Sequence, residues 1–233
     1  GDTTFKGYLA WDDALTGKRP GVVVFPEWWG LNDYARKRTE QLAGMGYVAL
    51  AADMYGDGKT TEHPKEAGAM AGAVRANTKD WEARASAALQ TLRANPLVDA
   101  KKVAAIGYCF GGSTALQLCY AGADLAAAVS FHGALVVPDD KQTKAIKARL
   151  LICHGAIDTF IPEETAQKTR AALENGHVRY EMIYYGGAQH SFTNPDADKA
   201  GLQGLSYNAA ADQRSWASMS ALFREVFGLA KMK

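Results

Sequence analysis

The sequence contains few cysteines and no long apolar run. Its three cysteines, Cys109, Cys119 and Cys153, are too few and too scattered for a disulfide framework or a zinc site. We therefore expect free thiols, and free thiols favour a reducing compartment. No stretch approaches the ~20 apolar residues that a membrane-spanning helix needs. These absences predict a soluble protein with no metal and no other cofactor.

An excess of charge of one sign is also missing. The chain has 26 basic and 25 acidic residues, a net charge of +1, so it offers no electrostatic reason to bind nucleic acid or an anionic membrane. With 48% hydrophobic and 22% charged residues, the composition is that of an ordinary globular protein. We expect a small-molecule ligand and a monomer or a weak homo-oligomer.

The length of 233 residues fits one domain over residues 1–233. A chain of this size buries roughly 70% of its unfolded surface and needs no covalent cross-link. The sequence starts at Gly1 without a methionine, so we expect that upstream residues were removed or left out. The free thiols favour the cytoplasm, and a periplasmic location stays open if a signal peptide was cleaved.

Short apolar runs alternate with helical segments along the chain. The predicted strands cover residues 3–11, 21–25, 47–52, 102–107, 126–131, 149–154 and 178–184, and the predicted helices cover 32–45, 65–77, 78–95, 110–121, 162–175 and 206–227. This alternation predicts an α/β fold, a mostly parallel sheet of about seven or eight strands with helices on both faces. We expect the first strand to pair antiparallel at one edge. Residues 132–148 leave no room for a lid domain, although loops 54–65 and 193–205 are expected to cover the pocket in part.

The strongest motif is the segment GYCFGG at residues 107–112, which lies between a buried strand and an apolar helix. It matches the strand–turn–helix elbow G-x-S-x-G of α/β-hydrolases, with Cys109 in place of serine. Gly107 and Gly111 allow the tight turn because larger side chains would collide with neighbouring backbone. The helix N-terminus favours a thiolate at Cys109. The alternative is a glycine-rich turn that holds an ordinary buried cysteine.

Two polar residues follow later strands in the order that an α/β-hydrolase triad requires. Asp158 comes just after the strand at 149–154, and His190 comes just after the strand at 178–184. Because the carboxyl ends of parallel strands share one edge of a sheet, both should lie near Cys109. The order nucleophile, acid, base is the one found in this fold. The backbone N–H of Phe110, the residue after the nucleophile, is expected in an oxyanion hole.

Four segments in order, FPEWWG, GYCFGG, HGAIDTFIP and GAQHSF, resemble the dienelactone hydrolase family over nearly the whole chain. The resemblance implies that Cys109 is the nucleophile, His190 the base and Asp158 the residue that orients it. It also implies that the N–H of Trp28 completes the oxyanion hole. The implied activity is hydrolysis of a small ester or lactone, as in carboxymethylenebutenolidase, through a thioester acyl-enzyme.

Glu27 is an unusual residue because a carboxylate directly after a buried strand is costly unless it is paired. The resemblance implies that Glu27 is an auxiliary acid that contacts the resting cysteine and keeps it neutral by raising its pKa. The alternative is a solvated loop residue. Replacement of Glu27 by glutamine would then change how Cys109 alkylation depends on pH.

The pocket is expected to include Trp29, Phe160, Phe192 and Asn194. Family members that act on dienelactone carry an arginine four residues after the base, where this chain has Asn194. This departure argues against strict dienelactone specificity, although Arg36 or Arg75 could reach the site. The other histidines, His63, His132, His154 and His177, are expected to be packing or surface residues.

Other functions stay open from the sequence. They are an acyl-thioesterase, a non-catalytic ligand-binding relative that kept the fold, and a redox-sensing thiol protein. The last of these would need neither Asp158 nor His190.

Overall fold

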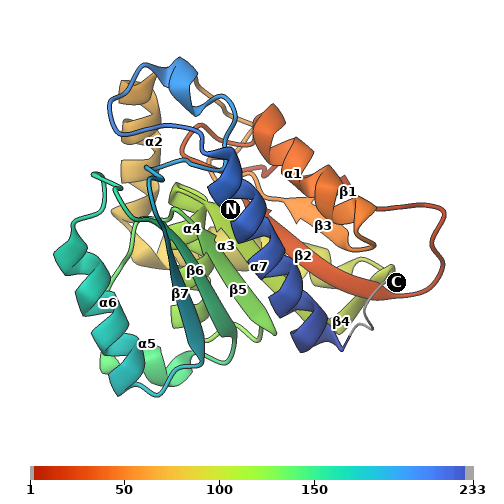
Figure 1. The fold of residues 1–233 in the computed structure, drawn as a ribbon. Helices are drawn as coiled ribbons and strands as arrows, with labels where there is room; N and C mark the ends of the chain where they lie inside the picture. Colours follow the sequence, from red (N-terminus) through yellow and green to blue (C-terminus); the bar gives the residue numbers. More distant parts are fainter. Residues whose placement is uncertain (1–2, 229–233) are drawn as a thin grey trace.

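The computed structural model describes residues 3–228 and contains one seven-stranded sheet (Figure 1). Its strands are β1 (Tyr8–Ala10), β2 (Arg19–Phe25), β3 (Val48–Ala51), β4 (Val98–Tyr108), β5 (Ala127–Phe131), β6 (Arg149–Gly155) and β7 (Tyr180–Tyr185). They lie in the order β1-β3-β2-β4-β5-β6-β7. Only β1 pairs antiparallel, at the edge beside β3, and the other pairs are parallel. The predicted α/β architecture is confirmed.

Helices cover both faces of this sheet (Figure 1). One face packs against α1 (Asp33–Gly44) and α7 (Ala209–Phe227). The other packs against α2 (Pro64–Arg75), α3 (Thr78–Ala94), α4 (Phe110–Tyr120) and α6 (Glu163–Asn175). The short helices α5 (Asp140–Ala145) and η1 (Ala197–Ala200) lie in connections. None of the helices within residues 3–228 is both long enough and apolar enough to cross a membrane.

The strand β2 illustrates why the apolar runs form a sheet covered on both sides. All seven of its residues are buried. Successive side chains of a strand point to opposite faces. Accordingly, Val22 and Val24 join the core under α1 and α7, whereas Val23 and Phe25 join the core under α3 and α4. A strand of this kind reads as a continuous apolar run because neither face meets water.

The boundaries of several elements differ from the prediction. The strand predicted over residues 3–11 is limited to Tyr8–Ala10, because only these residues pair with β3. The strand β4 begins at Val98 rather than at residue 102, since Val98 pairs with Arg19 before a register shift. The last helix begins at Ala209, after Asn208, whose side chain accepts the N–H of Ala211 as an N-cap.

The turn from β4 into α4 depends on backbone contacts that exclude side chains. A Cβ on Gly107 would lie 1.9 Å from the carbonyl oxygen of Gly111. A Cβ on Gly111 would lie 2.0 Å from the carbonyl oxygen of Phe25, at the end of β2. Real Cβ atoms do not approach backbone this closely, so both positions require glycine. The contacts press the start of α4 against the sheet.

Replacement of Gly111 by alanine should destabilise the protein by about 3 kcal/mol or more, because the colliding atoms are backbone and cannot rotate away. Gly44, near the end of α1, is a suitable control because a Cβ there would meet nothing within 4 Å. Gly44→Ala should change the free energy of unfolding by less than about 1 kcal/mol. Urea denaturation of both variants would measure this. Equal stability of Gly111→Ala and Gly44→Ala would contradict the close approach.

Candidate active site

Cys109 lies at the turn between β4 and α4 in a strained backbone conformation. Its φ is 51° and its ψ is −114°, and its residue surface is 9% exposed. A positive φ is uncommon for residues other than glycine and marks positions that the surrounding structure forces. Cys109 directly precedes α4, so its side chain sits at the positive end of an 11-residue helix.

The side chains of Cys109, His190 and Asp158 meet at the carboxyl edge of the sheet. His190 Nε2 lies 3.1 Å from Cys109 Sγ, and His190 Nδ1 lies 2.8 Å from Asp158 Oδ2. Asp158 follows β6 and His190 follows β7, and their side chains are 0% and 5% exposed. The imidazole therefore bridges the thiol and the carboxylate, as the sequence analysis expects.

This environment favours the protonated form of His190. Burial lowers the pKa of His190, but the electrostatic interaction with Cys109 and the hydrogen bonds to Asp158 and Cys109 outweigh burial and raise it to about 10. A thiolate beside an imidazolium is the arrangement that these interactions stabilise. The other two thiols differ, because burial raises the pKa of Cys119 and that of Cys153 to about 12. Both are core residues without a basic partner.

Glu27 is buried next to this group of side chains but does not bond to the cysteine. Its Oε1 accepts a hydrogen bond of 2.8 Å from Ser191 Oγ, and its Oε2 accepts one of 2.7 Å from Asn194 Nδ2. Burial raises the pKa of Glu27, and these two donors offset part of that effect. Both hydrogen bonds of Glu27 run to the segment after His190, and neither runs to Cys109. The prediction that Glu27 bonds to the resting cysteine is therefore wrong. The alternative of a solvated loop residue is also wrong, since Glu27 is 2% exposed.

The two backbone N–H groups expected in an oxyanion hole have no protein acceptor within residues 3–228. That of Phe110 is at the first turn of α4, where helix N–H groups lack an internal partner. Trp28 lies in the turn after β2, which the bond from Gly30 N to Glu27 O closes, and its carbonyl accepts from the hydroxyl of Tyr55. Both residues keep their expected role as a prediction.

The four expected pocket residues fall into two groups. Phe160 is 44% exposed, with its ring 5.1 Å from that of His190, and Trp29 is half-buried with its ring edge-on to Trp28. Phe192 is a core residue rather than a pocket wall, because it is fully buried between His132 and Tyr185. Asn194 is buried as well, and its amide is used by Glu27.

Arginines near the site interact with other groups. Arg38 is buried and pairs with Asp212 at 2.6 Å, and its guanidinium also donates to the carbonyl of Thr193. The guanidinium of Arg36 lies over the ring of Tyr8, and that of Arg75 lies over the ring of Phe110. Arg36 therefore lies at the β1 edge of the sheet and does not take the role at the site that the sequence left open for it. Arg75 is the exposed arginine that touches an elbow residue.

His132 is a site residue that sequence reasoning assigned to packing. It follows β5, the strand between β4 and β6, and is fully buried with a φ of 40°. Its Nδ1 accepts from the backbone N–H of Cys109 at 3.2 Å, and its Nε2 lies 2.7 Å from Thr193 Oγ1. The signal that could have found it is the one that found Asp158 and His190, a polar side chain just beyond the carboxyl end of a strand.

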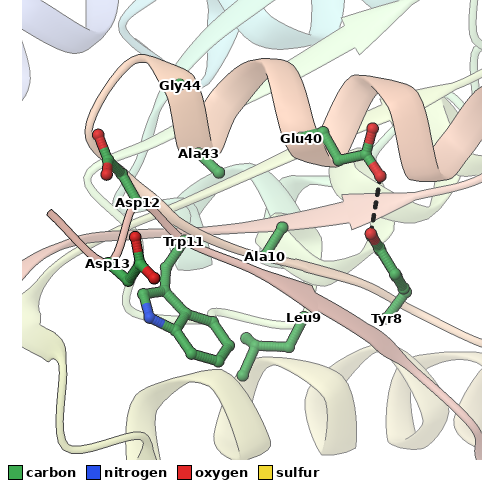
Figure 2. A pocket seen from close by; sticks show the side chains of 9 residues that line it. All are labelled: Tyr8, Leu9, Ala10, Trp11, Asp12, Asp13, Glu40, Ala43 and Gly44. Carbon is green, nitrogen blue, oxygen red and sulfur yellow. Dashed lines mark hydrogen bonds between the residues drawn. The ribbon is translucent and has the colours of Figure 1, made fainter.

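Two open depressions, with volumes of about 570 and 410 Å³, flank β1 and contain no triad residue. The first is lined by β1, residues 11–13 and the outer side of α1 (Figure 2). There the hydroxyl of Tyr8 donates to Glu40 at 2.7 Å, and Trp11 lies beside Leu9 (Figure 2). These depressions belong to the edge of the sheet and not to the site around Cys109.

A mostly parallel sheet with helices on both faces and a strained nucleophile-type turn after a central strand defines an α/β-hydrolase. The model of the dienelactone hydrolase family matches residues 5–227. A Synechocystis protein assigned as a carboxymethylenebutenolidase is 33% identical over 94% of this chain and 90% of its own length.

Solved structures agree with this match. A dienelactone hydrolase-like promiscuous phosphotriesterase from metagenomic libraries is 43% identical, with a TM-score of 0.94 over 97% of this chain and 94% of that one. A Klebsiella pneumoniae protein assigned as a dienelactone hydrolase is 25% identical, with a TM-score of 0.76 over 94% and 92% of the two chains. The chain belongs to the dienelactone hydrolase family of carboxylic-ester hydrolases.

The thiolate–imidazolium arrangement makes a prediction about pH. A free thiol of pKa ~8.5 is only roughly 0.3% ionised at pH 6. Because His190 Nε2 lies 3.1 Å from Cys109 Sγ and the pKa of His190 is raised, Cys109 should react with iodoacetamide at pH 6. In His190→Ala the reaction at pH 6 should slow, because the cationic partner of the sulfur is lost. Cys119 and Cys153 are buried internal controls. Equal alkylation rates of wild type and His190→Ala at pH 6 would contradict the pairing.

Replacement of Glu27 by glutamine tests the buried carboxylate. The charge of Glu27 acts on His190, so its loss should lower the pKa of His190. The imidazolium should therefore lose its proton at a lower pH, so the upper pH limit at which it can pair with a Cys109 thiolate should fall. The measurement is the rate of Cys109 alkylation against pH, with Glu40→Gln, at the exposed β1 edge, as the matched control. An unchanged profile in Glu27→Gln would remove Glu27 from the mechanism.

Proposed function

We propose that the chain hydrolyses a small ester or lactone with Cys109 as nucleophile, His190 as acid and base, and Asp158 as the residue that orients His190. The observation that carries the proposal is the bridge of one imidazole between Sγ at 3.1 Å and a carboxylate oxygen at 2.8 Å. Both distances are within the reach required for proton transfer between a nucleophile and a base.

In the first step the Cys109 thiolate attacks the carbonyl carbon and the carbonyl oxygen becomes negative. The N–H groups of Phe110 and Trp28 would donate to this oxygen, and donors fixed in the backbone cost no reorganisation as the charge forms. The protonated His190 then gives its Nε2 proton to the leaving oxygen. The products of this step are a thioester on Cys109 and an alcohol or an opened lactone.

In the second step His190, now neutral, takes a proton from a water molecule that attacks the thioester. Collapse of the second tetrahedral intermediate releases the acid and restores the thiolate. Asp158 supports both steps, because its bond to Nδ1 leaves Nε2 facing the sulfur and stabilises the imidazolium. The ring of Phe160 lies 5.1 Å from the imidazole at an interplanar angle of 35°.

The chemistry of the nucleophile limits the substrates. A thiolate leaves a tetrahedral intermediate more easily than an amide nitrogen does, because a free thiol has a pKa of only ~8.5. Activated esters, enol lactones and thioesters are therefore better substrates than peptides. The short connection between β5 and β6, which holds only the six-residue helix α5, adds no lid domain above Cys109.

The buried side chains argue for an uncharged acyl group. Asn194 offers its amide to Glu27 and supplies no positive charge for a substrate carboxylate. Arg38 is held by Asp212 and by the carbonyl of Thr193. The buried Glu27 adds a carboxylate beside the site and no positive charge. We infer that neutral esters and lactones are preferred over anionic dienelactones.

Phosphotriester hydrolysis is a second candidate. The observation that favours it is the 43% identity and the TM-score of 0.94 to a protein described as a dienelactone hydrolase-like promiscuous phosphotriesterase. Oxyanion donors that stabilise a tetrahedral carbon intermediate could also stabilise the developing charge on a phosphoryl oxygen.

A substrate panel with variants tests the proposal. Cys109→Ala should lower kcat for p-nitrophenyl acetate by about 10³-fold or more, since it removes the covalent route. Cys119→Ala is the matched control, because that thiol lies in the core, and it should keep wild-type kcat per folded molecule. The panel compares a neutral lactone, an anionic dienelactone, an acyl-thioester and a neutral phosphotriester. Full turnover by Cys109→Ala would overturn the role of Cys109 as nucleophile, and no turnover of any substrate by the wild type would leave a ligand-binding relative.

A further inference from the structure

The strained residues of the chain concentrate around the cysteine. Residues 3–228 include five non-glycine residues with a positive φ, and three of these lie in the site: Cys109 at 51°, His132 at 40° and Ser191 at 56°. Strain of this kind persists only where the surroundings hold it in place, and it concentrates at functional sites. Ser191 is held by Glu27. The backbone N–H of Cys109 is held by the carbonyl of Phe131 and by the ring of His132.

The hydrogen bonds of His132 define its tautomer. The backbone N–H of Cys109 donates to Nδ1 at 3.2 Å and also to the carbonyl of Phe131 at 3.0 Å, so Nδ1 carries no proton. Nε2 therefore carries the proton and donates it to Thr193 Oγ1 at 2.7 Å. With both ring nitrogens used and the ring fully buried, His132 cannot act as a second base.

The second bond of His132 leads to the segment that carries His190. Thr193 is three residues after His190, its hydroxyl lies 2.6 Å from that of Tyr34, and its carbonyl accepts from Arg38. One imidazole therefore connects the backbone of the cysteine to the loop of its acid–base partner. The rings of His132 and His190 are 5.4 Å apart and nearly perpendicular, and Phe192 packs edge-on against His132.

We propose that His132 is a positioning residue: as a neutral imidazole it holds the strained backbone of Cys109 and fixes the distance between Cys109 and His190 by its bond to Thr193. The inference rests on the proposed function in one respect, that Cys109 is the nucleophile. A loss of either bond would let the sulfur move relative to Nε2, and misplacement by about 1 Å can cost on the order of 10²-fold in rate.

The charged groups that face His132 keep it neutral. Burial lowers the pKa of His132, and His190, Arg38 and His154 lower it further. A proton on Nδ1 would also remove one of the two acceptors of the Cys109 N–H and leave only the carbonyl of Phe131. The two histidines thus differ in charge although their rings are in contact, since His190 has the carboxylate and the thiolate as partners.

The first test needs no substitution. Nitrogen-15 NMR of the histidine rings in the wild-type protein should show His132 as the neutral tautomer with its proton on Nε2 from pH 6 to pH 9. A ring with its proton on Nδ1, or an imidazolium at pH 7, would overturn the proposal.

The second test breaks the connection from each side. His132→Asn can present an amide oxygen to the Cys109 N–H and tolerates a positive φ, but it does not reach Thr193. Thr193→Val removes the hydroxyl on the other side. Each should lower kcat roughly 10- to 100-fold with little change in KM, and the double variant should be no worse than the poorer single one. Thr193→Ser, which keeps the hydroxyl, should recover most of the loss.

The readout that separates positioning from stability is the reactivity of the thiol. In His132→Asn and Thr193→Val the midpoint of Cys109 alkylation should move toward the value of a free thiol. His154→Asn, a buried histidine at the end of the neighbouring strand β6, is the matched control and should keep the wild-type midpoint. Wild-type midpoints and kcat in both variants would refute the proposal. Turnover that survives Cys109→Ala would refute the proposed function instead, and the tautomer and alkylation data would still decide the role of His132.

Discussion

The contact of Gly111 with the end of β2 is the constraint on which the site depends. It brings the first turn of α4 against the sheet, so the residue before that turn has to adopt a backbone that only glycine takes easily. Cys109 occupies that position and projects from the turn. The direction of its side chain is thus set by close-packed backbone, and not by the flexible contacts that usually orient a surface residue.

The same edge of the sheet gathers the remaining groups because parallel strands end together. Asp158, His190 and His132 follow β6, β7 and β5, and Glu27 follows β2. Each is buried, so each needs a partner, and the partners are one another or the segment after His190. Burial and mutual hydrogen bonding make one interdependent group from residues that are far apart in the chain.

Sequence reasoning could predict the features that have a local pattern. The apolar runs predicted the strands of the sheet, and the glycines around Cys109 predicted the turn from β4 into α4. The positions of Asp158 and His190 followed from their place beyond strand ends. It could not predict that Glu27 bonds to Ser191 and Asn194, because which of several buried donors reaches a carboxylate depends on side-chain packing across 164 residues of chain. The positive φ of His132 has no signature in a short run of residues, and its packing against Phe192 is a tertiary contact.

His190 is carried by a connection rather than by a strand, and this connection is tied down near its ends. The N–H of His190 donates to the carbonyl of Gly204, and its carbonyl accepts from Ser206. Between these ties, the exposed residues 195 and 196 and the turn η1 form an outward arc. Because loops tolerate insertions and deletions, the length of that arc can vary without displacing the imidazole. The fold thereby separates an exposed segment that can vary in length from the buried group of side chains around Cys109.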